Sequence, residues 1–362
     1  MHSWMKPGEP QPHQTTGWTA IGDTPKRPVP TRREFIRDCA LLAAAGPAIE
    51  ALARDDTQPP AGGIAPEAGA TALEQCHMPT PDVVQVQSPN VIRGHRTHPK
   101  ILAEMLENAL VELTGTTTVG GAWNQLLKSD ERIALKFNQS GADGIGTTDS
   151  MAETLVASLR DAGFPPDQLT LMEVPQPVWQ QLGCRPPPQG WQEAETDFGS
   201  GKDHLASVLE QIDAIINVPF LKSHNIAGLT CCLKNLSHAL VKHPARFHDH
   251  GCSPYVADIV ALPEIRSKLR LNIVNALRVV WDRGPQALLE CTEPVGALIV
   301  GQKPLTVDTV ALALLDDVRA GKGLATIVNT HGRIAYFGPA AARGLGTHEP
   351  YKIATRRLRV SV

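Results

Sequence analysis

The alternation of short apolar runs with segments of helical periodicity is the feature of this sequence that most restricts its fold. Apolar runs that predict buried strands lie at residues 83–86, 133–138, 169–174, 212–218, 269–275 and 297–300. Apolar residues at helical spacing predict helices at residues 99–113, 148–162, 204–211 and 305–315. This strand–helix–strand order favours an α/β fold, a mostly parallel sheet with helices on both faces. We predict such a fold, rich in loops and with a loop or insertion at 184–202, as a single domain over residues 82–362.

Composition and charge exclude several classes of protein. Hydrophobic residues make up 42% of the chain, enough for a core, so disorder is excluded for most of it. The 34 basic and 37 acidic side chains give a net charge of -3, without the basic excess typical of nucleic-acid binding. No apolar run approaches the roughly 18 residues that a membrane-spanning helix needs. We expect neither a nucleic-acid partner nor a stable membrane anchor.

The first 53 residues have the order of features found in a twin-arginine signal peptide. Two arginines at positions 32 and 33 precede Phe35, an Ala-rich apolar stretch follows at 39–46, and Ala-Leu-Ala at 51–53 offers a small-residue cleavage site. The alternative is an amphipathic helix that begins with two arginines. The signal predicts the twin-arginine translocation machinery as a partner and a periplasmic or extracellular location. Residues 54–81, rich in Pro, Gly and Ala, are then predicted to form a flexible linker.

The predicted export route and the cysteine pattern together indicate which kind of cofactor this chain could bind. Proteins exported in this way fold before they cross the membrane, which favours a bound metal or organic cofactor, although fast or oligomeric folding explains the same signal. The cysteines beyond the signal are too few for a disulfide scaffold. Because no C-x-x-C spacing occurs, an iron–sulfur cluster is not expected, and a transition metal is the cofactor hypothesis that remains. These cysteines are Cys76, Cys184, Cys231, Cys232, Cys252 and Cys291.

Five of the 13 histidines lie within residues 224–250, directly after a predicted strand. Open α/β sheets bind their ligands beyond the carboxyl ends of the strands, and neutral imidazole is a common metal ligand. His248, His250 and Cys252 alternate along a segment predicted to be extended, which places all of them on one side as candidate metal ligands. His224, at the end of the strand, is a candidate for proton transfer or a further ligand. The alternative is a solvated His-rich loop without a metal.

Lysine and asparagine side chains also gather at predicted strand ends. Lys234 has apolar neighbours on both sides, so it must pair with an anion or lose its proton, which makes it a candidate for anion contact or acid–base work. Lys136 and Asn138 end a predicted strand, and Lys222 and Asn235 lie in the histidine-rich region. These four are candidates for binding a substrate or cofactor. The alternatives are surface lysines and a strand-to-loop turn that uses Asn for backbone reasons.

Five separated segments follow one family pattern in order. They are Lys-x-Asn at 136–138, Val-Pro-Phe-Leu-Lys-Ser-His at 218–224, Leu-Lys-Asn-Leu at 233–236, Asp-Arg-Gly-Pro at 282–285 and residues 301–310. Over about residues 82–347 the chain resembles the family called domain of unknown function 362 (DUF362). Many members carry a ferredoxin-like module that this chain lacks, so the resemblance is to an exported branch without it. Phe220 and Lys303 depart from the family pattern, which has a basic and an acidic residue there.

Two classes of function follow. The first is an exported enzyme or redox protein, dependent on a metal or cofactor, that acts on a small anionic substrate. The second is a non-catalytic cell-envelope protein that binds a small anion or a polymer. Asp308, after the strand at 297–300, either caps a helix or faces the same cleft. The resemblance implies no established reaction. Both hypotheses therefore depend on the candidate site residues given above.

Overall fold

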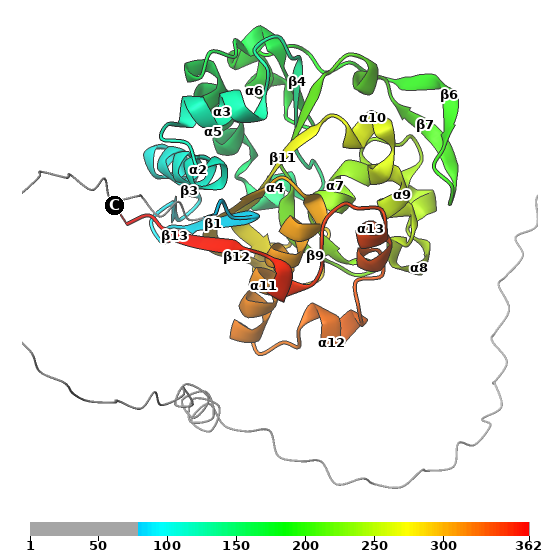
Figure 1. Cartoon of the computed structure of the whole chain (residues 1–362). Coiled ribbons are helices and arrows are strands. Elements are labelled where there is room, and N and C mark those ends of the chain that lie inside the picture. Colours follow the sequence, from blue (N-terminus) through cyan, green and yellow to red (C-terminus); the bar gives the residue numbers. More distant parts are fainter. Residues whose placement is uncertain (1–78, 362) are drawn as a thin grey trace, which may run out of the picture. The chain divides into compact units, whose positions relative to one another are not determined.

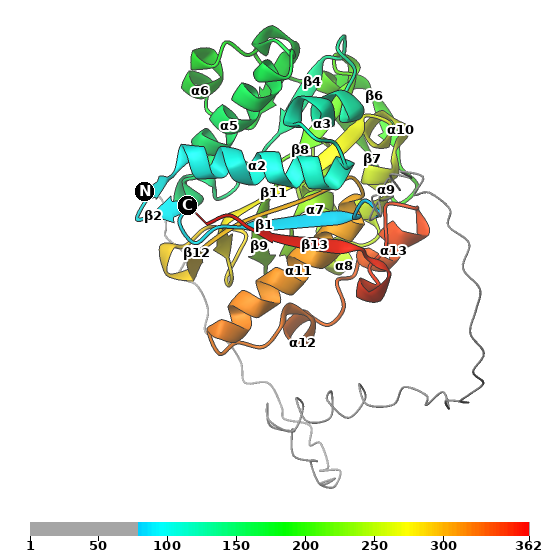
Figure 2. The same cartoon turned by 60° about the vertical axis from the view of Figure 1, so that its left-hand side comes forward.

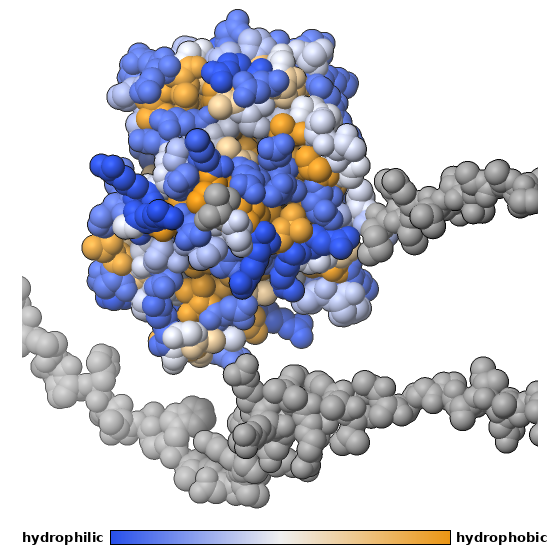
Figure 3. All heavy atoms as spheres, turned by 90° about the vertical axis from the view of Figure 1, so that its left-hand side faces the viewer, coloured by the Kyte–Doolittle hydropathy of each residue, from blue (hydrophilic) through white to orange (hydrophobic). Residues whose placement is uncertain are grey.

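A computed structural model describes residues 79–361 of the chain. The signal peptide predicted at residues 1–53, and nearly all of the linker predicted at 54–81, lie outside this range. Within it, no helix has the length and apolar character needed to cross a membrane. On the face in Figure 3, hydrophilic residues surround separate hydrophobic patches.

The central sheet is mostly parallel, as predicted (Figure 1). Its strand order is β13-β1-β12-β11-β8-β4-β5, with β9 beside β11 and β10 beside β9. Strands β5, β4, β8, β11 and β9 run parallel to one another, and β1 is parallel to β13. In contrast, β12 is antiparallel to β1 and β11, and β10 is antiparallel to β9. The strands are β1 (Val83–Gln87), β4 (Ile133–Lys136), β5 (Leu169–Met172), β8 (Ala214–Asn217), β9 (Phe220–His224), β10 (Gly228–Thr230), β11 (Leu269–Val280), β12 (Thr292–Gly301) and β13 (Thr355–Arg359).

Helices cover both faces of this sheet because its strands are apolar on both sides. In β4, Ile133 and Leu135 face one core and Ala134 faces the other, since successive strand residues point to opposite faces. Figure 2 shows α2 and α11 on opposite sides of β1. One face carries α2 (Pro99–Thr114), α3 (Val119–Leu126) and α5 (Thr148–Asp161). The other carries α7 (Cys232–His238), α9 (Tyr255–Ala261), α11 (Pro304–Gly321) and α13 (Phe337–Ala342).

Shorter elements connect these layers. Strands β2 (Ile92–Arg93) and β3 (Arg96–Thr97) form a small hairpin. The short helices are α4 (Ala142–Ile145), α6 (Gln176–Gln181), α8 (Asp249–Cys252), α10 (Pro263–Arg266) and α12 (Ile327–His331).

Two local predictions between residues 184 and 211 are wrong. The segment predicted as a helix at 204–211 begins as part of strand β7 (Lys202–Ala206) and continues as a single 3₁₀ turn, Ser207–Glu210. The predicted loop contains β6 (Trp191–Asp197), which pairs with β7 in an antiparallel hairpin. A segment this short has no clear periodicity. Its conformation is set by pairing and by the buried Asp203 carboxylate, which accepts hydrogen bonds from the backbone N–H groups of His204 and His243.

Candidate functional site

Three neighbouring parallel strands end together at one edge of the sheet. Lys136, at the end of β4, is paired in register with Met172 of β5 and Asn217 of β8. The residues just beyond these ends, Asn138 and Glu173, therefore meet at the same edge. The short helix α7 begins beside it, since Asn217 donates a hydrogen bond to the Cys232 carbonyl at 3.1 Å. Segments almost 100 residues apart in the chain thus come together here.

The Asn235 side chain of α7 is the centre of a buried hydrogen-bond network. Its Oδ1 accepts from Lys136 Nζ and from Asn138 Nδ2, both at 3.0 Å. Its Nδ2 donates to Asn217 Oδ1 at 2.8 Å and to the Lys136 carbonyl at 3.2 Å. An ammonium group can only donate, so the contact with Lys136 fixes which amide atom is the oxygen. Each polar atom of this amide is therefore satisfied.

Three lysine side chains are buried at this edge: Lys136 and Lys222 are 0% exposed and Lys234 is 6% exposed. Lys136 pairs with Glu173 at 3.1 Å. Lys222 donates to Asn138 Oδ1 at 3.0 Å and to the Ser140 carbonyl. Among the residues of the described range, Glu173 is the one carboxylate that pairs with any of these lysines. The edge therefore has more buried positive than negative charge.

Burial lowers the pKa of each of these lysines because it disfavours the charged form. For Lys222 the pKa falls to about 7: burial is the main cause, the charges of Lys234 and Lys136 lower it further, and Glu173 raises it. The attraction of Glu173 opposes the effect of burial at Lys136. An added anion at this edge would favour the charged form of these lysines.

The imidazoles of His224 and His248 are held in defined orientations. His248 Nδ1 lies 3.2 Å from the Pro244 carbonyl and donates to it, so Nε2 accepts the contact of Lys234 Nζ at 3.2 Å. His224 Nδ1 accepts hydrogen bonds from the backbone N–H groups of Ile226 at 3.1 Å and Ala227 at 3.2 Å. Burial, reinforced by the Lys234 charge, lowers the pKa of His224 to about 3 and also lowers that of His248. These two rings are therefore neutral near pH 7.

The predicted metal ligands His248, His250 and Cys252 do not line one side of an extended segment. The chain turns through α8 instead, with left-handed φ angles of 53° at His250, 66° at Gly251 and 66° at Cys252. His250 is exposed. In its place His238, from α7, joins His248 and Cys252, with one ligand atom of each within 4.8 Å of the others. The prediction of an extended segment was wrong because the left-handed turn at 250–252 directs the His250 side chain to solvent, away from His248 and Cys252.

Asp308 caps a helix, one of the two roles considered for it, but the helix is α7 rather than its own. Its carboxylate accepts from the backbone N–H groups of Cys232 at 2.7 Å and Leu233 at 3.1 Å. Burial raises the pKa of Asp308 to about 6. Both carboxylate oxygens are used at the helix start, which gives this residue a structural role. The described cysteines, including adjacent Cys231 and Cys232, are free thiols.

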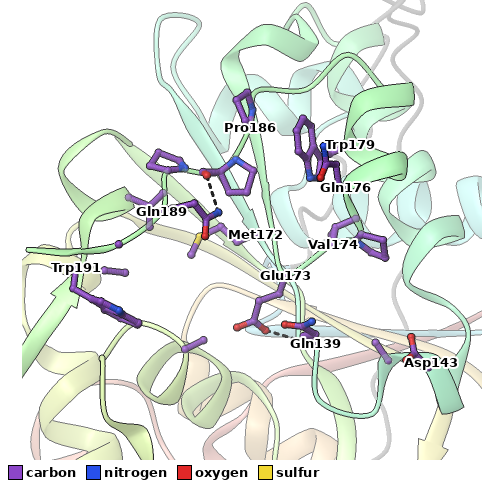
Figure 4. Close-up of a pocket in the computed structure, with 18 residues that line it drawn as sticks. Gln139, Asp143, Met172, Glu173, Val174, Gln176, Trp179, Pro186, Gln189 and Trp191 are labelled. Atoms are coloured by element: carbon purple, nitrogen blue, oxygen red, sulfur yellow. Dashed lines mark hydrogen bonds between the residues drawn. The ribbon is translucent and has the colours of Figure 1, made fainter.

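A cavity of about 390 Å³ opens onto this network. Beside it lies a larger groove of about 800 Å³, and the two share Gln139, Glu173 and Ala239. Figure 4 shows this groove, with the indoles of Trp179 and Trp191 on opposite sides and Glu173 bonded to Gln139. The smaller cavity is lined by Asn138, Gln139, Ser140, Glu173, Lys234, Asn235, His238 and Ala239.

Sequence reasoning missed three residues of the site: Glu173, Asn217 and His238. Glu173 follows β5 as Asn138 follows β4, so the strand-end argument that selected Asn138 also applies to it. His238 lies four residues after Lys234 on one helix and hence on the same face. Asn217 is the last residue of β8, as Lys136 is the last residue of β4, so the strand-end argument applies to it too.

A comparison with protein families finds a match in the part of the chain that contains most of this site. Residues 189–313 match the family model described as Domain of unknown function (DUF362). The match includes β8, β9, α7 and α8, and therefore most of the polar network, whereas β4 and β5 precede it. No curated protein matches the chain.

Proposed function

This chain belongs to the DUF362 family through residues 189–313, and we propose its function from the polar side chains at the sheet edge. We propose that the cavity there binds the oxyanion group, a carboxylate or a phosphate, of a small molecule. The observation that carries the proposal is the burial of three lysine side chains with Glu173 as the one carboxylate paired with them in the described range, beside a cavity that Lys234 lines. Buried charge is stable only when it is paired, and an anion in the cavity supplies the missing partner.

Lys234 is the lysine that contacts this anion. It lines the cavity, and its hydrogen-bond partner is the neutral imidazole of His248, which leaves its charge without a counterion. Lys136 and Lys222 lie one layer behind the cavity lining. Lys136 donates a hydrogen bond to the side-chain oxygen of Asn235, and Lys222 donates one to that of Asn138. Both lysines add positive potential in a region of low dielectric constant. Asn138 uses one amide N–H within the network, so its second N–H is available to a bound oxyanion.

A catalytic role is the second candidate. The observation that favours it is the buried Nε2 of His238, which has no hydrogen-bond partner although the residue lines the cavity. An unpaired ring nitrogen beside a bound anion is suited to accept a proton or to hold a ligand. Turnover of a bound anionic substrate would distinguish an enzyme from a binding protein, since both would be stabilised by the ligand.

The proposed setting is outside the cytoplasm. The twin-arginine segment at residues 1–53 is the support for export, and it predicts that the protein folds before translocation. A buried network assembled from β4, β5, β8 and α7 requires the completed fold, which is compatible with such a route.

Replacing Lys234 by Gln is expected to weaken binding of inorganic sulfate by about 10- to 100-fold, since a charge-assisted hydrogen bond contributes about 1.5–3 kcal/mol. Isothermal titration calorimetry of the purified chain measures the affinity. Lys242→Gln is the control, because Lys242 is an exposed lysine of the same region. Equal sulfate affinity in Lys234→Gln and wild type would show that the cavity is not the anion site.

Sulfate affinity is expected to fall as the pH rises above about 7, the pKa of Lys222. The ammonium form attracts the anion and is complete below this pKa, so affinity is lost, not gained, on the alkaline side. Lys234, Lys136 and Glu173 face the same group, and sulfate keeps its double charge over this range. Calorimetry across this pH range tests the expectation with Lys222→Met as the comparison. An equally steep fall in that variant would rule out Lys222 as its cause.

A further inference from the structure

We propose that His238, His248 and Cys252 bind a divalent transition-metal ion of the Zn²⁺ type at the inner wall of the anion cavity. One ligand atom from each residue lies within 4.8 Å of the other two. Tetrahedral Zn²⁺ with bonds of about 2.0–2.3 Å needs ligand atoms about 3.5 Å apart. Each pair must therefore close by about 1.3 Å at most, which side-chain rotation can supply. This inference rests on observations independent of the lysine charges.

The two imidazoles already have the hydrogen bonds that orient metal ligands. His248 Nδ1 donates to the Pro244 carbonyl at 3.2 Å. His238 Nδ1 lies 2.8 Å from Ser237 Oγ, and that hydroxyl donates its own hydrogen to the Lys234 carbonyl. Ser237 can therefore only accept from His238, so Nδ1 carries the hydrogen and Nε2 carries the lone pair. Such outer partners are found on most metal-bound histidines.

His238 Nε2 is the clearest sign of a missing ligand. It is buried and has no partner at normal hydrogen-bond distance, and the nearby Phe247 backbone carbonyl raises the pKa of this ring, against the larger lowering by burial. Buried polar atoms are satisfied in most proteins, so an orphaned lone pair beside a second imidazole needs an explanation. The ring centroids of His238 and His248 lie 4.6 Å apart at an interplanar angle of 82°, so the rings meet edge to face, and one ligand atom of each lies within 4.8 Å of the other. A cation between them satisfies both lone pairs.

Cys252 reaches the two imidazoles through an unusual backbone. It is 0% exposed and follows two other left-handed residues, His250 and Gly251. Left-handed conformations are costly for residues other than glycine and concentrate at functional sites. A nucleophilic role fits less well, because the cavity is lined by His238 but not by Cys252. Nitrogen and sulfur donors together select Zn²⁺ and related borderline metals over Mg²⁺ or Ca²⁺.

The metal and the anion occupy adjoining positions. Lys234 Nζ now contacts His248 Nε2, so a metal at that nitrogen requires the ammonium group to leave it and turn into the cavity, where an anion accepts it. Three protein ligands leave a fourth position open, as in catalytic zinc sites. His238 lies on the cavity wall, so an oxyanion held by Lys234 is placed to fill that position.

Titration of the full, metal-free chain with Co²⁺ tests the proposal. We expect uptake of one equivalent, with the visible bands of tetrahedral Co²⁺ and a near-ultraviolet charge-transfer band from thiolate sulfur. Cys252→Ala should abolish the charge-transfer band, and His238→Ala should weaken Co²⁺ binding by at least about tenfold. His250→Asn is the matched control, since Asn tolerates the left-handed backbone there and the residue lies outside the cluster.

Two results would overturn the metal site. One is a wild-type Co²⁺ spectrum without the thiolate band, which needs no variant and is unaffected if a variant fails to fold. The other is a loss of binding in His250→Asn equal to that in His238→Ala. Failure of the anion site is recognised separately, because Lys234→Gln should lose sulfate while retaining Co²⁺, and Cys252→Ala should lose Co²⁺ while retaining sulfate.

Discussion

Replacing Asn235 by Ala is expected to lower the free energy of unfolding by about 4 kcal/mol. The substitution removes the acceptor of Lys136 Nζ and Asn138 Nδ2, and it leaves Asn217 Oδ1 without its donor. Each buried polar group without a partner costs about 1–3 kcal/mol, and removing one partner of a buried charge costs about 3–5 kcal/mol. Glu173 still neutralises Lys136, so the expected loss stays near the middle of this range. Urea denaturation measures it.

The control for this substitution is Asn329→Ala. Asn329 is exposed in α12, and replacing it should change stability by less than about 0.5 kcal/mol. A loss of less than about 1 kcal/mol in Asn235→Ala would contradict the network, since it would mean that the buried polar atoms find other partners at little cost.

Replacing Gly284 by Ala is expected to destabilise the protein by about 3 kcal/mol and to disturb the strand that carries two site residues. A Cβ at position 284 would lie 2.0 Å from the Ser223 carbonyl oxygen. The loop also bonds to β9, since Gly284 N–H donates to Ser223 Oγ and Asn225 N–H donates to the Gly284 carbonyl. Because the clash involves backbone, it cannot be relieved by a change of rotamer, and forced overpacking of this kind costs about 1–3 kcal/mol or more. Ser223 lies between Lys222 and His224, so sulfate affinity should fall as well.

Gly120→Ala is the matched control with the opposite sign. Gly120 lies inside α3 with open space around the position of a Cβ, so Ala should stabilise the helix by about 0.5–1 kcal/mol. Thermal unfolding followed by circular dichroism compares the two variants. A Gly284→Ala protein as stable as wild type would mean that the loop does not close tightly on β9.

The sequence predicts the buried parts of this fold well because their physical signal is local. Strands such as Ile133–Lys136 begin with three successive apolar residues and are buried at all four positions, which only a sheet covered on both faces satisfies. The rule that ligands bind beyond the carboxyl ends of parallel strands likewise selects Lys136, Asn138 and Lys222 before any coordinates are known, and the structure brings them within hydrogen-bond distance of one network.

The errors have a different physical origin. The β6–β7 hairpin and the left-handed turn at 250–252 depend on pairing and backbone angles that residue type does not determine. His250 was therefore expected to face the same way as His248, although it is exposed. Glu173 also has a left-handed φ of 59°, at the point where the backbone leaves β5. Its ion pair with Lys136 depends on the order of strands in the sheet.

The seven residues of α7 serve two sides of the molecule at once. Lys234 and His238 are one turn apart and line the cavity, and Asn235, about 100° around the axis, both lines the cavity and forms hydrogen bonds to the strand ends. One residue inserted directly before Cys232 would rotate every later side chain of α7 by about that angle, so Asn235 would no longer face the strand ends. The connection that precedes α7 therefore has a fixed length, whereas β6, exposed along most of its course, can change length without moving any of these side chains.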